Sequence, residues 1–410
     1  MAQKKNSSNK TTKKVVKAAK KAAKKNPLVF IIIIIVIAAL AIGLYFLWVN
    51  VISPTMEHNK ANQGSNEPES STVIPSSSSS SSSKVPFTGD VAPIDINFLE
   101  LGNKYTGDSI FIKAGDVDIL IDAGSRQNSA TTISTFVDQY CTDGILEYVI
   151  ATHAHQDHIA GFVGSNSAEG VLKHYKIDTL IDFSLTNATS SIYNNYVSLR
   201  DEKVASGDIA HHYTANDCIQ GNNGAKKVYE LAPGITMEIL DQKFYREKTS
   251  DENDYSVCAM FSQGDNHYLF TGDLEKDGEA SLVELNTLPE VELFKGGHHG
   301  SYTANTDALL NVVKPKTVCI CCCAGSEEYT DNVDNMFPAQ AAINRMAKWT
   351  DKIYVTTLMI DYKNGQYQSM NGNINFHCTA GKEYAVTGSN NSTILKDTDW
   401  FKNNRTWPTY

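Results

Sequence analysis

The sequence predicts a layered α/β domain preceded by one apolar N-terminal segment. Short apolar strands recur in two groups along residues 91–385, and helical stretches lie between some of them, which favours stacked layers of sheets and helices. One long uncharged run near the N-terminus predicts a single membrane span. With 410 residues and 41% hydrophobic content, the chain can bury a real core, which excludes a disordered protein.

Residues 1–27 form a basic segment that we expect in the cytoplasm. Residues 1–49 contain ten lysines and no Arg, Asp or Glu. Lysines before an apolar span favour retention on the cytoplasmic side and attract anionic lipid. A nucleic-acid-binding tail is the alternative, and it is the weaker one because the apolar span follows directly.

Residues 28–49 predict a transmembrane signal anchor. These 22 residues carry no charge, and a helix of that length would span roughly 33 Å, which matches a bilayer core. A cleaved signal peptide has a shorter apolar region and a small-residue cleavage site, whereas NVISPTM follows here. Tyr45 and Trp48 lie near the outer end, where aromatic rings prefer the interface. We therefore expect a single-pass protein of the cell membrane whose main portion is extracytoplasmic.

Residues 50–90 predict a flexible linker, because they are rich in Ser, Asn, Pro and Glu and include eight consecutive serines from Ser76 to Ser83. A random coil of this length reaches roughly 35 Å. The folded domain is expected over residues 91–385. Residues 386–410 form a C-terminal tail, for which an added strand, a docking segment and disorder all stay open.

Charge is divided unevenly along the chain. The formal net charge of −10 combines the basic N-terminus with a remainder that holds 26 basic and 46 acidic residues. Because phosphate contacts need Lys or Arg, this acidic remainder argues against a stable nucleic-acid complex. An anionic substrate would need a local cation to hold it. The oligomeric state stays open.

The first group of strands is expected in IDINFLEL, DSIFIKAG and VDILIDAG, whose close spacing predicts an antiparallel meander. A helix over residues 130–139 precedes a fourth strand in EYVIATHAH. The second group comprises ITMEIL, YSVCAMFS, HYLFTGD, VELFKGG and KTVCICCC. Between the groups, residues 165–227 are polar and predict irregular, partly helical structure.

The most informative segment is ATHAHQDHIAG, which holds His153, His155, Asp157 and His158. Neutral imidazoles and a carboxylate are ligands that a divalent ion such as zinc uses. Alternate residues of an extended segment point the same way, so His153 and His155 can meet at one ion while the other two face a second. A solvated polar loop is the alternative, but three histidines and an aspartate directly after an apolar strand disfavour it.

Three further strand ends carry candidate groups. Asp273 follows HYLF, His298 and His299 follow VELFKGG, and Asp122 follows VDILI. Each has an ordinary alternative: a Gly-Asp turn, a surface histidine pair, and a turn-forming aspartate. Loops at strand ends often converge into a site, so we expect Asp273 to be a bridging carboxylate and Asp122 to be able to orient a ligand imidazole.

The order LIDAG, THAHQDHIAG, TGD and KGGHHGS resembles the metallo-β-lactamase superfamily. More narrowly, it is similar to the hydrolase domain of ComEC/Rec2-type competence proteins and their stand-alone relatives, over most of the chain from about Pro93 to Gly381. The HxHxDH core points to the superfamily, and GHHGS with NDYS points to the subfamily.

This resemblance implies an αββα sandwich with two divalent metal ions, zinc or manganese, at the edge between two sheets. It implies that His153 and His155 bind the first ion and that Asp157 and His158 bind the second. It implies that Asp273 bridges both ions and that His298 completes the second, with His299 as an alternative ligand or a contact of the substrate phosphate. A hydroxide held between the ions would be the nucleophile, with Asp157, Asp122 and His299 as the catalytic group.

The chain departs from the family pattern at two places. No third histidine for the first ion lies between Gly161 and Asp273 in a GHxxG-type loop, and we expect the remaining histidines of that stretch to be on the surface: His174, His211 and His212. In the subfamily, NDxS occupies this position, so Asn253 and Ser256 are expected to line the site and bind substrate. The second departure is MFPAQ, where relatives often have a His-Pro pair.

Lys295 and Ser301 flank the histidine pair and are candidates for a phosphate contact, with a solvated strand end as the equal alternative for Lys295. The CICCC segment lacks paired CxxC spacing, so core packing is favoured over a zinc cluster. Free thiols would suit a reducing or anaerobic habitat.

The sequence therefore predicts a membrane-anchored, extracytoplasmic dinuclear metallohydrolase that attacks an anionic phosphodiester. Nucleic acid, nucleotides and phosphodiesters of the cell envelope are the candidate substrates. Hydrolysis of a carboxylic ester, lactone or β-lactam by the same centre is one alternative. A surface binding protein that kept the fold and lost the chemistry is the other.

Overall fold

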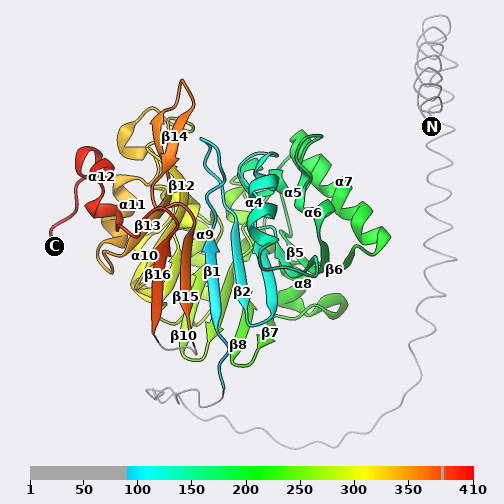
Figure 1. Cartoon of the computed structure of the whole chain (residues 1–410). Helices are drawn as coiled ribbons and strands as arrows, with labels where there is room; N and C mark the ends of the chain where they lie inside the picture. Colours follow the sequence, from blue (N-terminus) through cyan, green and yellow to red (C-terminus); the bar gives the residue numbers. More distant parts are fainter. Residues whose placement is uncertain (1–89, 380–382) are drawn as a thin grey trace, which may run out of the picture. The chain divides into compact units, whose positions relative to one another are not determined.

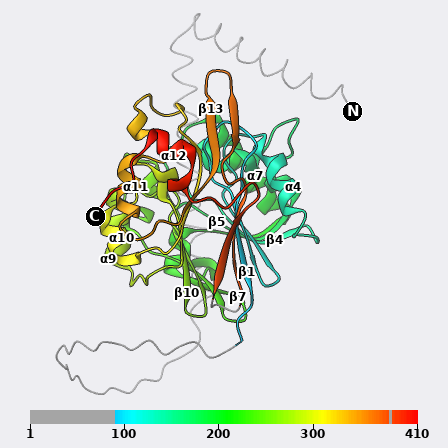
Figure 2. The ribbon, with the colours of Figure 1, turned by 60° about the vertical axis from the view of Figure 1, so that its left-hand side comes forward.

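The computed structural model describes residues 90–379 and 383–410 (Figure 1). Two eight-stranded sheets lie between two groups of helices, as the view from the side shows (Figure 2). This mixed α/β sandwich agrees with the predicted αββα class. The predicted segments 1–27 and 28–49 and nearly all of the linker 50–90 lie outside the described residues. Within the described ranges, no helix is long and apolar enough to cross a membrane.

The first sheet has the strand order β16-β15-β1-β2-β3-β4-β5-β6. Strands β1, β2 and β3 form the predicted antiparallel meander, and β3, β4, β5 and β6 run parallel to one another. Its strands are β1 Ile94–Phe98, β2 Ile110–Ala114, β3 Val117–Ile121, β4 Ile145–Ile150, β5 Lys176–Asp182, β6 Ile209–Thr214, β15 Ile374–Cys378 and β16 Tyr384–Gly388.

Helices cover the outer face of this sheet because parallel neighbouring strands need crossover connections. They are α4 Ser129–Val137, α5 Gln156–Val163, α6 Val171–His174, α7 Ser191–Ser206 and α8 Ala215–Gln220. The expected helix over residues 130–139 is α4. The longest, α7, begins after Ser190, whose hydroxyl accepts a hydrogen bond from the Tyr193 amide, and it ends at Gly207 in the left-handed region.

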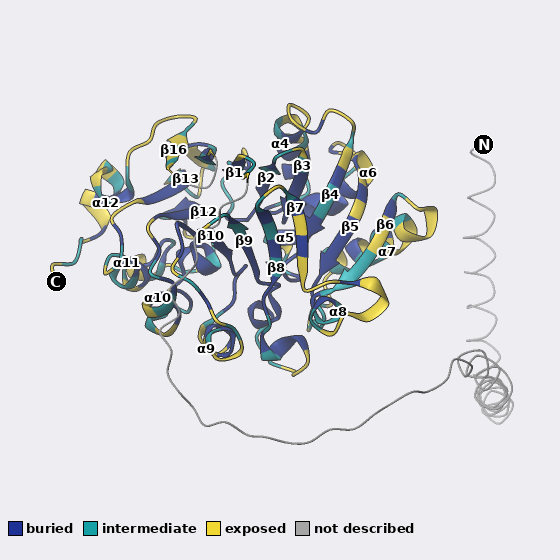
Figure 3. Cartoon of the chain, turned by 90° about the horizontal axis from the view of Figure 1, so that it is seen from below, coloured by how far each residue is buried: buried dark blue, intermediate teal, exposed yellow. Residues whose placement is uncertain are grey.

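The second sheet has the order β14-β13-β12-β11-β10-β9-β8-β7, with a parallel centre from β10 to β13. Its strands are β7 Val228–Ala232, β8 Ile235–Ile239, β9 Ala259–Gln263, β10 Asn266–Phe270, β11 Leu293–Lys295, β12 Val318–Ala324, β13 Ile353–Asp361 and β14 Gln366–Ser369. Helices α9 Lys276–Leu285, α10 Asp307–Val313 and α11 Gln340–Met346 pack on its outer face. Figure 3 shows the strands buried and the exposed residues confined mainly to the helices and loops.

Two expectations from the sequence need correction. Residues 165–227 contain two strands of the first sheet, β5 and β6, in addition to helices. The sequence of β6, IAHHYT, does not show a strand pattern because β6 lies at the edge of the sheet. Only Ile209 is buried, and the residues after it are more exposed. The predicted boundary between residues 385 and 386 falls inside β16, which adds a strand to the first sheet, and the short helix α12 Asp399–Asn404 follows.

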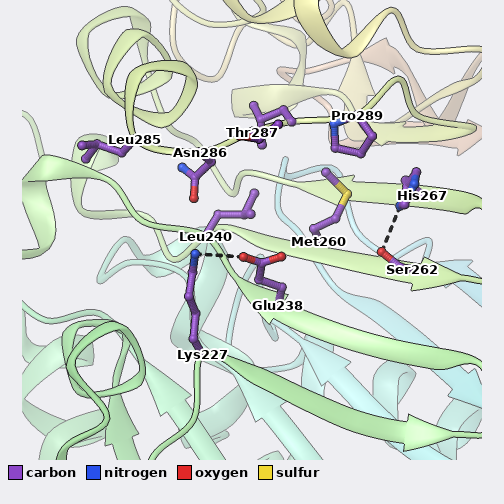
Figure 4. Close-up of a pocket in the computed structure, with 11 residues that line it drawn as sticks. Lys227, Glu238, Leu240, Met260, Ser262, His267, Leu285, Asn286, Thr287 and Pro289 are labelled. Carbon is purple, nitrogen blue, oxygen red and sulfur yellow. Dashed lines mark hydrogen bonds and ion pairs between the residues drawn. The ribbon is translucent and has the colours of Figure 1, made fainter. Parts of the chain in front are cut away.

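A cavity of about 550 Å³ lies on the outer face of the second sheet, away from the motif loops (Figure 4). Residues 285–289 lie opposite Leu240 and Met260 there. Polar groups at its rim are already paired, since Lys227 Nζ lies 2.9 Å from Glu238 Oε1 and Ser262 Oγ lies 2.9 Å from His267 Nδ1.

All eight cysteines are buried and free. In β12, Cys319 and Cys321 pack into the core between the sheets, whereas Cys322 packs under the outer helices. Adjacent strand residues point to opposite faces, so core packing accounts for the CICCC run as expected.

We expect the thiols to be unreactive in the folded protein. Burial raises the pKa of Cys141 and Cys322 to about 12, so little thiolate is present at neutral pH. Titration with a chromogenic disulfide should detect almost no thiol in native full-length protein and all eight in guanidinium chloride. Rapid reaction of several thiols in the native protein would contradict the buried arrangement.

Candidate metal centre

Four loops meet at one edge of the sandwich, and each follows a strand from a parallel part of a sheet. Residues 122–126 follow β3 and residues 151–158 follow β4, while residues 271–275 follow β10 and residues 296–301 follow β11. Gly124 permits the close approach, because a Cβ at this position would overlap the carbonyl oxygen of Asp157. The sequence motifs are therefore brought together by the common direction of these strands.

The first pair of donor atoms comes from the segment after β4. His153 Nε2 lies 3.0 Å from His155 Nδ1, so both nitrogens can face one ion. The other ring nitrogen of His153 lies 3.2 Å from Thr152 Oγ1 and 3.4 Å from Ser256 Oγ. Ser256 therefore contacts the far side of the ring and orients it, and does not replace the missing third histidine.

The second group of donor atoms surrounds one oxygen of Asp273. Nε2 of His158 and Nε2 of His299 each lie 3.1 Å from Asp273 Oδ2. His299 Nε2 also lies 3.6 Å from Asp157 Oδ2. Both imidazoles are fully buried, so these four side chains form a compact set of nitrogen and oxygen donors.

Each of these two imidazoles has a second carboxylate on its Nδ1 side. His158 Nδ1 lies 2.7 Å from Asp122 Oδ2, and His299 Nδ1 lies 3.1 Å from Asp108 Oδ1. Thr152 holds Asp122 in place by donating its amide and its hydroxyl, at 2.8 and 2.7 Å. His299 Nδ1 also lies 2.8 Å from the Cys321 carbonyl oxygen, which is its hydrogen-bond partner. The Asp122 carboxylate and this carbonyl group orient the two histidines and leave Nε2 for the ion.

Asp108 was missed by the sequence analysis. Together with His158, Asp273 and His299 it forms a buried set whose ligand atoms lie within 4.8 Å of one another. The Asp108 oxygens lie on the Nδ1 sides of the His158 and His299 rings, whereas Asp273 lies on their Nε2 sides. An ion bound to the two Nε2 atoms would therefore be next to Asp273 and not next to Asp108. The tripeptide Thr-Gly-Asp occurs at residues 88–90, 106–108 and 271–273, so this repeat alone did not single out Asp108.

The residues fit a divalent metal ion. His299 Nε2 is buried and makes no hydrogen bond of acceptable geometry within the described part of the chain, although Asp273 lies close to it. A buried ring nitrogen without a hydrogen bond is costly unless another partner, such as a metal ion, satisfies it. The nitrogen and carboxylate donors are those that zinc and manganese bind.

The electrostatics support a cation here. Burial lowers the pKa of His158, but Asp273 and Asp122 outweigh it and raise this pKa to about 10. Burial also opposes protonation of His299, and Asp273 and Asp108 hold its pKa well above the usual value. Burial alone would raise the pKa of Asp273, yet the charges of His158 and His299 hold it well below its ordinary value. The buried carboxylates Asp108, Asp122 and Asp273 thus favour a positive charge at this centre, either on the imidazoles or on a metal ion.

Lys295, expected to contact substrate, is instead buried behind the centre. Its ammonium group contacts Asp108, lies 3.1 Å from Asp273 Oδ1 and donates to the Gly272 carbonyl oxygen at 2.8 Å. Ser301 is also buried, with its hydroxyl 2.8 Å from that of Thr303. Neither side chain lines the cavity at the mouth of the centre.

His298 and His299 adopt different roles, since only His299 reaches the donor set. His298 Nδ1 lies 3.0 Å from Glu275 Oε1, and its Nε2 lies 3.9 Å from Asp273 Oδ2. Asn253, as expected, lines the site and donates to the same Glu275 oxygen at 3.1 Å. The geometry therefore favours His299 over His298 as the ligand.

The three histidines that the sequence analysis expected on the surface lie away from the centre. His174 Nε2 contacts Asp138 on the surface at 3.0 Å, and His212 Nε2 lies 3.0 Å from Asp182 Oδ1. His211 is exposed on the edge strand β6. None of them replaces a third histidine at the first pair of donors.

A cavity of about 640 Å³ forms the mouth of the centre. His155, Asp157, His298 and Asn253 line one part of it. The rest is lined by residues that the sequence analysis did not identify: Arg126, Gln156, Glu328, Tyr329 and Tyr362. Tyr329 lies in the loop after β12. Tyr362 is the first residue of the turn between β13 and β14, and this hairpin projects beyond the sheet (Figure 1).

Comparison with known families decides the relationship. The model of the family described as "Metallo-beta-lactamase superfamily" matches residues 102–324. The chain belongs to the metallo-beta-lactamase superfamily. That membership, together with the Asp and His cluster, identifies a metal-dependent hydrolase with a divalent-ion site.

Two curated relatives of this metallo-beta-lactamase protein confirm the expected similarity to ComEC/Rec2-type proteins. ComE operon protein 3 of Bacillus subtilis is 27% identical over 181 residues, which cover 43% of this chain and 20% of the relative. Recombination protein 2 of Haemophilus influenzae is 26% identical over 214 residues, which cover 52% and 22%. The chain thus spans about a fifth of the length of these relatives.

Among solved structures, the chain is similar to the metallo-beta-lactamase fold protein YhfI from Bacillus subtilis. The TM-score is 0.36 and the identity 10%, with 67% of this chain and 99% of that chain covered.

Substitution of the two adjacent histidines should separate their roles. We expect His299→Ala to lower bound metal by at least one ion per chain, because it removes a nitrogen directed at Asp273. His298→Ala, the matched control, should keep the wild-type metal content. Elemental analysis of folded full-length protein measures both, and the reverse pattern would assign the ligand to His298.

A buried carboxyl beside the site should give a measurable pH effect. Burial, followed by the nearby charges of Asp251 and Glu275, raises the pKa of Asp254 to about 6 from 3.8. Because the folded-state pKa is the higher one, the stability that Asp254 contributes is present below pH 4 and lost as the pH rises through 6. Asp254→Asn should therefore raise the free energy of unfolding at pH 7 by about 1–2 kcal/mol and change it little below pH 4.

Urea unfolding at several pH values measures this difference. Asp331→Asn, an exposed carboxyl in the loop after β12, is the control for general loss of charge. Equal effects of Asp254→Asn at pH 4 and pH 7 would contradict the expectation.

Proposed function

We propose that this protein is a membrane-anchored hydrolase that uses two divalent metal ions, zinc or manganese, to cleave a phosphodiester outside the cell membrane. One observation carries the proposal: two groups of donor atoms lie next to each other, with the His153 and His158 ring centres 4.1 Å apart, and each group contributes one residue, His155 or Asp157, to the wall of one cavity. His153 and His155 form one group, and His158, Asp157 and His299 form the other. Two ions held in this way are suited to an in-line displacement at phosphorus.

The chain's own residues would position the substrate. When bound, divalent ions would polarise a phosphoryl oxygen and make water more acidic. Asp122 holds the His158 imidazole and the Cys321 carbonyl oxygen holds the His299 imidazole, each through Nδ1. Glu275 orients Asn253 and His298 toward the cavity, where the amide and ring can donate hydrogen bonds to the substrate.

The cellular setting of the proposal comes from the sequence. The apolar run 28–49 with lysines before it would place the catalytic domain outside the membrane. The acidic main portion disfavours a stable nucleic-acid complex, so we propose a small or locally bound phosphodiester substrate.

Hydrolysis by metal-loaded full-length protein tests this function. We expect cleavage of bis(p-nitrophenyl) phosphate and none of nitrocefin, and at least about a hundredfold lower rate for Asp157→Ala because a ligand is lost. The control Asp277→Ala should keep the wild-type rate, since this side chain is exposed and does not line the cavity. Cleavage of nitrocefin alone would favour the ester, lactone or β-lactam alternative.

Activity that survives Asp157→Ala would contradict the dinuclear centre. Absence of both metal and hydrolysis in the wild type would favour a binding protein without chemistry. Metal content measured on the same preparation distinguishes these two outcomes.

A further inference from the structure

The cavity at the metal centre has a cation in its wall that the family motifs do not include. Arg126 lines the same 640 Å³ cavity as the donor residues His155 and Asp157. It follows β3 by a short loop, and no metal-binding motif contains it. Lys295, the cation that the sequence suggested for substrate, is enclosed by Asp108 and Asp273 and is not available.

Several contacts hold the Arg126 side chain in one orientation. Nη2 lies 2.7 Å from Glu328 Oε1, and Nη1 donates to the Ser125 carbonyl oxygen at 2.8 Å. The guanidinium carbon lies 3.8 Å from the centre of the Tyr105 ring. With its amide oriented to satisfy both side chains, Gln156 accepts from Nε and Nη1 at 3.2 and 3.0 Å.

The cation faces the cavity more than its carboxylate partner does. The Arg126 side chain is 30% exposed, whereas that of Glu328 is 6% exposed. Glu328 also accepts from the Thr106 amide at 2.9 Å, so its second oxygen is occupied. An anion entering the cavity would therefore meet the guanidinium first, and an N–H of Nη2 that has no partner among the described residues remains to bind it.

Two aromatic rings line the cavity beside Arg126. The Tyr329 hydroxyl donates to Asp157 Oδ2 at 2.7 Å, yet 54% of this residue is exposed. Lys104 Nζ lies 4.3 Å from the centre of the Tyr362 ring and donates to the Tyr362 carbonyl oxygen at 2.9 Å. Each ring is thus held at the mouth while part of it stays available for contact.

We propose that Arg126 binds an oxygen of the substrate phosphate and that Tyr329 and Tyr362 contact a planar group attached to that phosphate. The proposal rests on the phosphodiesterase function above and names the chemistry of its substrate. A planar guanidinium binds phosphate in a directional way, and aromatic side chains add stacking contacts that depend on a ring in the ligand. The domain is acidic, so one arginine held in position, rather than a broad basic surface, would supply the local positive charge that binds the anionic substrate.

Calorimetry on metal-loaded full-length protein tests the assignment, with thymidine 5′-monophosphate and glycerol 3-phosphate as probes. These probes share a phosphate and differ in the ring. Arg126→Ala should weaken both by about tenfold or more, because a charge-assisted hydrogen bond is lost. The double variant Tyr329→Ala/Tyr362→Ala should weaken the thymidine probe at least about fivefold and the glycerol probe little.

Arg246→Ala is the matched control. Its side chain is 35% exposed and also pairs with a carboxylate, that of Asp241, but it does not line the cavity. Both affinities should stay within twofold of the wild type in this variant. Tyr329→Phe controls for an indirect effect on Asp157, since it removes the hydroxyl and keeps the ring.

Affinities within twofold of the wild type in folded Arg126→Ala would overturn the phosphate contact. If that variant does not fold, Arg126→Gln decides the same point, because it keeps a polar side chain and loses the charge; unchanged affinity would overturn the phosphate contact. An equal loss for both probes in the double tyrosine variant would overturn the ring contact. Absence of hydrolysis by the wild type would contradict the proposed function, while the binding measurements still decide the role of Arg126.

Discussion

The geometry of the centre depends on how the two oxygens of the Asp273 carboxylate are used. Lys295 lies 3.1 Å from Oδ1, so Oδ2 is presented to Nε2 of both His158 and His299. A buried carboxylate is costly unless opposite charges compensate it, and here an ammonium group and two imidazoles do so from different sides. Because Asp273 follows β10 and Lys295 ends β11, the parallel pairing of these strands decides which oxygen faces the donor set.

The second constraint is that the centre joins the two sheets. Asp122 and His158 both come from loops of the first sheet, whereas Asp108, just before β2, contacts His299 from the second. The Asp108–His299 contact therefore ties the sheets together at the same edge where the donor atoms meet. Separation of the sheets would disrupt ligand geometry and leave buried charges unpaired, so fold stability and metal binding are coupled.

Sequence patterns predicted the parts of the fold that repeat locally. Alternating or continuous apolar runs between turn residues mark the meander β1 to β3 and the strands β8 to β12. Such runs can be recognised from neighbouring residues alone, without knowledge of contacts between distant parts of the chain. The strand β6 escaped prediction because its sequence, IAHHYT, is polar and the edge strand is only half-buried. Its strand conformation depends on pairing with β5, a contact between residues far apart in sequence.

By itself the sequence determined the kind of chemistry, because ligand residue types and the HxHxDH spacing are local properties. The tertiary structure decided which groups act together. It placed His299 rather than His298 at Asp273, buried Lys295 behind the centre, and brought Asp108 onto the second imidazole. These outcomes depend on the direction in which each loop leaves its strand and on which charged groups are buried next to one another. Both are decided only when strands far apart in sequence pair and loops from the two sheets meet.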